Sequence, residues 1–101
     1  MTRKIQLKDL VEYSQQNVNK QEAHRGKDFN VVVVCLERGQ EIPVHYESYD
    51  TFFFLISGKG IFTIGQDQLE MEEGDMVFSP AGERGIKALE RMSILGVQQP
   101  H

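Results

Sequence analysis

A chain of 101 residues is long enough for one folded domain and leaves little room for a second. Its residues are 40% hydrophobic and 26% charged, a balance typical of globular proteins. The 11 basic and 15 acidic residues give a net charge of −4, which excludes general binding to nucleic acid, because phosphate contacts need clustered lysine and arginine.

The N-terminal part of the chain, residues 1–29, is predicted to hold a short helix and an arm. Leu7, Leu10 and Val11 fall on one side of a helix spanning residues 6–15. Residues 16–27 are polar and show no sustained period, which indicates a linker or an arm laid across the surface.

From residue 30 onward, short apolar segments alternate with turns that contain glycine. The predicted strands cover residues 30–36, 42–47, 51–56, 61–64, 68–71, 76–79, 84–88 and 92–97. Short strands at this regular spacing are typical of an all-β sandwich or barrel, which we place over residues 30–98.

Two of these segments, residues 31–36 and 52–56, are apolar on both faces of a strand. A strand with one face in water should alternate between apolar and polar residues. Burying one such valine or phenylalanine side chain is worth roughly 1.5–3 kcal/mol, so an exposed face would be costly. A second sheet, the N-terminal arm or a partner subunit can cover the face outside the barrel, and we expect a homodimer.

Cys35 is the single cysteine, so no disulfide can form within the chain, and its place in an apolar strand indicates a small buried residue. No run of the sequence has the apolar length of a signal peptide or of a membrane span. We therefore expect a cytoplasmic protein that acts without a membrane partner.

Two segments of the chain, residues 39–60 and 74–86, contain glycine, histidine and proline at a characteristic spacing. The positions that carry this spacing are Gly39, His45, Gly58, Gly74, Pro80 and Gly82. The pattern resembles the two motifs of the cupin superfamily, and the resemblance covers residues 31–97. It implies a small single-domain cupin, that is, an antiparallel β-barrel of the jelly-roll, RmlC-like type, preceded by the short helix.

In that family, two histidines and a glutamate from the first motif and a histidine from the second hold a metal ion. At the matching positions this sequence has His45, Glu47, Thr51 and Gly85, so the first alone is unchanged. A threonine hydroxyl is a weak ligand, glycine has no side chain, and catalytic metal sites usually need three protein ligands. The resemblance therefore implies a degenerate metal site, and we predict no metal cofactor.

One alternative stays open, in which a divalent metal ion is held by His45 and Glu47. These residues are two apart on an extended segment, so both can point to the same face. Such a site needs a substitute ligand from elsewhere in the chain, and the candidates of suitable type are His24 and Asp50.

Six residues are predicted to bind a ligand, and no residue is assigned a catalytic role. His45 and Glu47 form either a hydrogen-bonded pair at a polar pocket mouth or a pair for general acid–base chemistry. Arg84 either faces an anionic ligand, which suits a guanidinium, or is a solvated loop residue. The loss of a histidine side chain at residue 85 is expected to open volume inside the barrel. The six residues are His45, Tyr46, Glu47, Thr51, Arg84 and Gly85.

Three functions stay open from the sequence, because this fold hosts unrelated chemistries. The function we favour is a pocket for a small organic molecule, without the usual metal. The second is a metal-dependent enzyme of the dioxygenase or isomerase type, with a rearranged ligand set. The third is a structural dimer whose pocket is vestigial.

Overall fold

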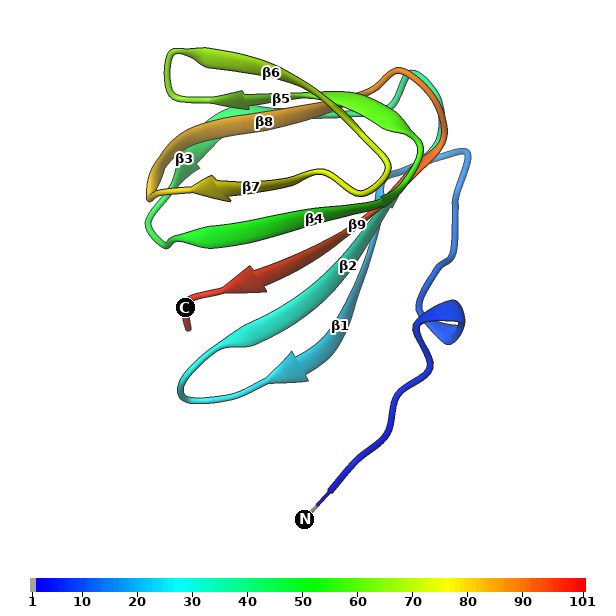
Figure 1. The fold of residues 1–101 in the computed structure, drawn as a ribbon, viewed down its shortest axis with the longest axis vertical. Coiled ribbons are helices and arrows are strands. Elements are labelled where there is room, and N and C mark those ends of the chain that lie inside the picture. The colour runs from blue at the N-terminus through cyan, green and yellow to red at the C-terminus, as the bar shows by residue number, and fades with distance from the viewer. Residues whose placement is uncertain (1) are drawn as a thin grey trace.

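The computed structural model of the chain describes residues 2–101, which form two layers of β-sheet (Figure 1). The elements are a 3-10 turn η1 (Leu7–Asp9) and the strands β1 (Asn19–Arg25), β2 (Asn30–Leu36), β3 (Glu41–Glu47), β4 (Thr51–Ser57), β5 (Lys59–Ile64), β6 (Asp67–Glu72), β7 (Met76–Ser79), β8 (Gly82–Ala88) and β9 (Met92–Gln98). One sheet has the strand order β1-β2-β9-β4-β7, and the other has the order β3-β8-β5-β6. Neighbouring strands pair antiparallel, so the predicted all-β, antiparallel architecture is confirmed.

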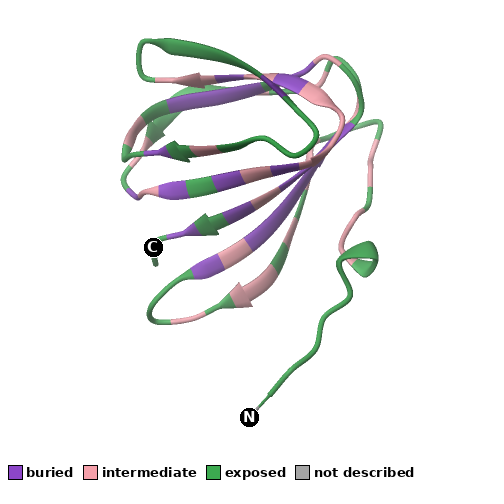
Figure 2. Ribbon diagram, in the orientation of Figure 1, coloured by how far each residue is buried: buried purple, intermediate pink, exposed green. Residues whose placement is uncertain are grey.

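The core lies between the two sheets, and the buried residues that form it come from strands of both (Figure 2). Leu55 and Ile94 from one sheet and Phe62 from the other are fully excluded from solvent. Phe53 on β4 meets Phe62 on β5 edge to face, with ring centres 5.4 Å apart. Burial of such side chains is worth roughly 1.5–3 kcal/mol each, so this interior holds the two layers together.

The crossing from one sheet to the other after β4 depends on Gly58. Its φ of +89° lies in the left-handed region that side chains disfavour. A Cβ atom there would also lie 2.1 Å from the carbonyl oxygen of Arg91, which is far inside contact distance. Glycine is therefore required at this turn, as the sequence predicted.

The helix predicted over residues 6–15 is reduced to the single 3-10 turn Leu7–Asp9. Leu7 is 40% exposed, so the apolar side on which the prediction rested is not buried. A short helix without a buried face is unstable, because its few hydrogen bonds do not offset the cost of nucleation. Within residues 2–101, no helix is long and apolar enough to cross a membrane.

The prediction of a linker or a surface arm over residues 16–27 is wrong for the stretch that forms β1, which is a strand of the sheet. This strand pairs with β2 along its length, with Lys20 opposite Val34. Backbone hydrogen bonds make that pairing, so a polar sequence suffices at the edge of a sheet, where charged side chains also discourage further strand addition. The five-stranded sheet therefore begins before residue 30.

Strand β2 is covered on both faces, as its unbroken apolar sequence predicted. Val32 and Val34 face the interior between the sheets, whereas Val33 and Cys35 lie on the opposite face and are fully buried. The backbone of Glu12 lies close to the Cys35 thiol and acts to lower its pKa. The segment before β1 thus covers this part of the outer face.

Candidate functional site

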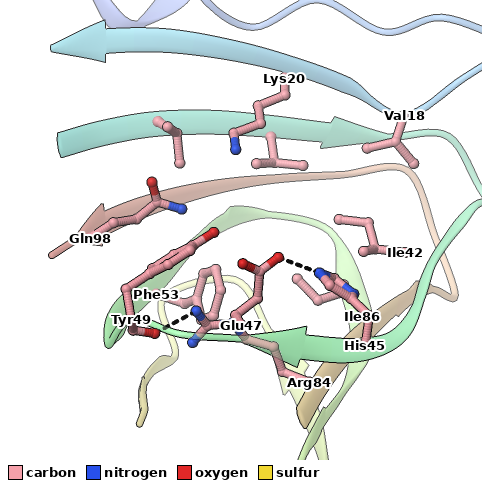
Figure 3. A pocket seen from close by; sticks show the side chains of 13 residues that line it. Val18, Lys20, Ile42, His45, Glu47, Tyr49, Phe53, Arg84, Ile86 and Gln98 are labelled. Carbon is pink, nitrogen blue, oxygen red and sulfur yellow. Dashed lines mark hydrogen bonds and ion pairs between the residues drawn. The ribbon is translucent and has the colours of Figure 1, made fainter. Parts of the chain in front are cut away.

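A cavity of about 210 Å³ lies between β1 and β2 on one side and β3 and β8 on the other (Figure 3). Its apolar wall is formed by Val18, Val32, Val34, Ile42, Phe53 and Ile86. Its polar side chains are Lys20, His45, Glu47, Tyr49, Arg84 and Gln98. An apolar wall with a few convergent polar groups is the usual composition of a small-molecule site.

The structure brings four of the six predicted ligand-binding residues to this cavity, and two lie elsewhere. Tyr46 points away from it, with 69% of its surface exposed, because successive side chains of β3 face opposite ways. Thr51 is buried but does not line the cavity, and its hydroxyl has no hydrogen-bond partner within the described part of the chain.

A bulge in β3 determines which of its side chains face the cavity. The pairing of β3 with β8 shifts between Ile42 and His45, so that two residues of β3, Pro43 and Val44, lie opposite one residue of β8. Residues three apart on a regular strand face opposite sides, yet Ile42 and His45 both line the cavity. The extra residue therefore turns His45, and with it Glu47, toward the interior.

His45 and Glu47 form a hydrogen-bonded pair. The imidazole Nε2 contacts the Glu47 carboxylate oxygen Oε1, and Nδ1 lies 2.8 Å from the carbonyl oxygen of Pro43. Both ring nitrogens face acceptors, so the imidazolium form, with a proton on each, satisfies both contacts. The Pro43 carbonyl first and the Glu47 carboxylate second raise the pKa of His45.

Hydrogen bonds stabilise the ionised form of Glu47. Burial acts to raise the pKa of this carboxyl, but the hydrogen bond from His45 and the nearby hydroxyl of Tyr49 outweigh burial and lower the pKa. Burial also raises the pKa of the Tyr49 hydroxyl, which keeps its proton as a donor. In the imidazolium form of His45, the charges of the pair cancel.

Arg84 is buried against the cavity, with 5% of its surface exposed. Its Nη1 donates to the carbonyl and hydroxyl oxygens of Ser79, at 3.1 and 2.8 Å, and its Nη2 donates to the carbonyl oxygen of Tyr49 at 2.7 Å. The guanidinium carbon also lies 4.9 Å from the centre of the Tyr49 ring. The interpretation of Arg84 as a solvated loop residue is therefore wrong.

The expectation that residue 85 opens volume inside the barrel is also wrong. Arg84 pairs with His45 across β3 and β8, and both side chains face the cavity, so the next position on β8 faces away. A Cβ atom at Gly85 would lie 2.9 Å from the carbonyl oxygen of Ile42 and 2.9 Å from the amide nitrogen of Val44. Gly85 borders the cavity with its backbone alone, and glycine fits there because the bulge of β3 approaches so closely.

The residues at the four family positions do not fit a metal ion. His45 has both ring nitrogens turned to acceptors, Thr51 lies outside the cavity, and Gly85 faces the bulge. Across residues 2–101, histidine, cysteine, aspartate and glutamate side chains form no group of three or more that could hold an ion. The substitute candidates do not line the cavity either: His24 lies against Phe29, and Asp50 accepts a hydrogen bond from the amide of Ala81.

Sequence reasoning missed Lys20 and Gln98, which line the cavity from β1 and β9. Lys20 was missed because the polar sequence around it gave no sign of a strand. Gln98 could have been found, since alternation along β9 from the buried Ile94 places residues 96 and 98 on the inward face.

The sequence of the chain was compared with models of known protein families and with curated proteins. A family model described as Cupin domain matches residues 32–84 of the chain. No curated protein matches the chain.

Several solved structures share the fold along nearly the whole chain. An RmlC-like cupin protein from Desulfovibrio desulfuricans is 22% identical with a TM-score of 0.87, and the match covers 99% of this chain and 98% of that one. A conserved protein of unknown function from Streptococcus pyogenes is 24% identical with a TM-score of 0.84, over 100% and 90% of the two chains. A cupin superfamily protein from Desulfitobacterium hafniense is 16% identical with a TM-score of 0.84, over 100% and 94%. These likenesses confirm the predicted RmlC-like barrel.

Proposed function

The chain belongs to the cupin family, and from this premise we propose that it binds a small organic molecule between its sheets without a metal ion. The observation that carries the proposal is the guanidinium of Arg84, which is buried and faces the cavity. A fixed positive charge disfavours a divalent cation and favours a ligand that accepts hydrogen bonds.

The size and lining of the cavity support an organic ligand. About 210 Å³ exceeds the roughly 150 Å³ of a cavity that accommodates a benzene ring. Val32 and Val34 from one sheet and Ile86 from the other provide an apolar wall that favours hydrocarbon over water. A compact molecule with a short apolar body fits this space.

The polar side chains would orient such a ligand. The His45–Glu47 pair, the Tyr49 hydroxyl and the Gln98 amide provide donors and acceptors on the lining. Few, well-placed polar groups in an apolar pocket fix orientation and give specificity. Binding of this kind needs no covalent change in the ligand.

A thermal-shift screen of small organic molecules tests this function. A molecule present at a hundred times its dissociation constant should add roughly 2.7 kcal/mol to the free energy of unfolding. Val34→Phe, which fills the cavity, should abolish the shift, whereas Ile61→Phe, a substitution outside the lining, should preserve it. A shift that survives Val34→Phe would place the ligand elsewhere and contradict the proposal.

Elemental analysis of untagged protein tests the absence of a metal requirement. We expect metal far below one ion per chain and an unchanged ligand-induced shift after treatment with a chelator. Near-stoichiometric metal, together with loss of the shift on chelation, would overturn the metal-free half of the proposal.

A further inference from the structure

The guanidinium of Arg84 is held by neutral groups, although the Glu47 carboxylate lies near enough for the charge of Arg84 to lower its pKa. The oxygens that accept the hydrogen bonds of Arg84, from Ser79 and Tyr49, are neutral. Within residues 2–101, no carboxylate forms an ion pair with its guanidinium. A buried charge is costly unless it is paired, and the carbonyl dipoles and the Tyr49 ring offset this cost without cancelling the charge.

A second cation faces the same cavity from the opposite sheet. Lys20 lies on β1 opposite Val34, and both line the cavity, so the lysine side chain is on the inward face. In Figure 3 its amino group lies over the cavity, across from the strand that carries Arg84. Among the ion pairs of residues 2–101, none includes Lys20. Lys20 is exposed, so its flexible chain can adjust to a ligand.

Cations outnumber carboxylates among the residues that line the cavity. Glu47 is the carboxylate of the lining, and it is hydrogen-bonded to His45. Lys20 and Arg84 therefore leave the lining with a surplus of positive charge whether or not His45 carries a second ring proton. Low-dielectric walls strengthen the attraction that such a surplus exerts on an anion.

Resting on the proposed function, we infer that the ligand is a small carboxylate whose anionic group lies between Lys20 and Arg84 and whose apolar body lies against Val32 and Ile86. The planar guanidinium suits a carboxylate, which accepts two parallel hydrogen bonds from it. The lysine ammonium adds attraction from the side of β1. A neutral molecule of the same shape gains the apolar contacts but neither charge contact.

Matched pairs of probes test the charge. Sodium butyrate, 3-methylbutanoate and benzoate are each titrated against the corresponding primary amide by isothermal calorimetry at low salt. At least one acid should bind roughly tenfold or more tightly than its amide, and added salt should reduce that preference. Acids and amides that bind equally would overturn the carboxylate inference and leave the organic-ligand function standing. If neither acids, amides nor any other small molecule binds, both proposals fail.

Lys20→Gln tests the position of the anion without disturbing a buried group. It should weaken binding of the acid several-fold more than binding of the amide, because only the acid loses a charge contact. Lys87→Gln is the matched control, because it removes the same charge from an exposed position of β8 outside the cavity lining. Equal effects of the two substitutions would overturn the placement, since long-range attraction alone would then explain the preference.

Discussion

At the scale of single residues, Gly85 shows how a backbone contact limits the site. The bulge of β3 lies so close that a Cβ atom would meet the carbonyl oxygen of Ile42 and the amide nitrogen of Val44, both at 2.9 Å. Backbone atoms cannot move aside as flexible side chains can. Gly85→Ala should therefore lower the free energy of unfolding by about 1–3 kcal/mol, as measured in urea.

Gly85→His, which restores the residue type of the family motif, separates this steric account from the loss of a metal ligand. We expect it to destabilise the protein at least as much as the alanine variant and to bind no zinc. Tight zinc binding by Gly85→His, with stability intact, would show that position 85 does face the cavity.

The His45–Glu47 pair should make stability depend on pH. Because the pKa of His45 is raised on folding, its contribution is present below the unfolded value and is lost as pH rises through the folded value. Because the pKa of Glu47 is lowered, its contribution is present above the unfolded value and is lost as pH falls through the folded one. The pair therefore contributes most between the ordinary pKa values of a glutamate and a histidine.

Urea unfolding of the parent and of His45→Gln at about pH 5.5 and about pH 8.5 checks this expectation, because the ordinary histidine pKa lies between the two. The stability difference between the two proteins should be larger at the lower pH. Glu47→Gln should flatten the pH dependence of the parent. An equal difference at both values would argue that His45 stays neutral beside Glu47.

At the scale of elements, the segment before β1 shields the outer face of β2. Cys35 is fully buried there, and burial raises the pKa of its thiol, so both access and thiolate formation are disfavoured. We expect Cys35 to react slowly with Ellman's reagent in the folded protein. Deletion of residues 2–18 should increase the rate several-fold while the thermal transition is retained. An unchanged rate would mean that other groups shield the thiol.

The sequence predicted the strands from residue 30 onward because β-branched runs and glycine turns act locally. It did not predict β1, since an edge strand draws on backbone pairing that a polar sequence does not reveal. It also left open whether Arg84 is buried at the cavity or solvated in a loop, and it expected open volume at Gly85, where the backbone of β3 lies too close. Side chains of a strand alternate, so an error of one residue reverses which of two neighbours faces the interior. Because β1 was not predicted, Lys20 was not recognised as a cavity residue, and its positive charge at the cavity was missed.

At the scale of the whole molecule, the outer face of the five-stranded sheet is apolar. Strand register places two rows of side chains across β2, β9, β4 and β7. The rows are Val31, Val97, Phe52 and Phe78, and Val33, Leu95, Phe54 and Met76. Phe52, Phe78 and Met76 are 46%, 52% and 63% exposed. Contiguous apolar surface of this kind is typical of an interface between subunits.

The homodimer expected from the sequence stays a prediction, and this face is where we expect it to form. Two copies related by a two-fold axis would bury the exposed part of these rows, which is Val97, Phe52, Phe78 and Met76. Val33 is already covered within the chain. Light scattering after gel filtration should give twice the mass of the chain. Phe52→Glu should give monomers, whereas Tyr46→Glu, at an exposed position of the other sheet, should not. A monomeric parent protein would contradict this prediction.

Strand β1 is attached to the barrel through β2 alone among the described strands, yet it carries Lys20 over the cavity. Edge strands fray at lower cost than whole domains unfold. A bound molecule beneath Lys20 could escape each time β1 peels back. Its residence time would then depend on how often the backbone hydrogen bonds between β1 and β2 open. The route by which the ligand leaves would be separate from the residues that determine which ligand binds.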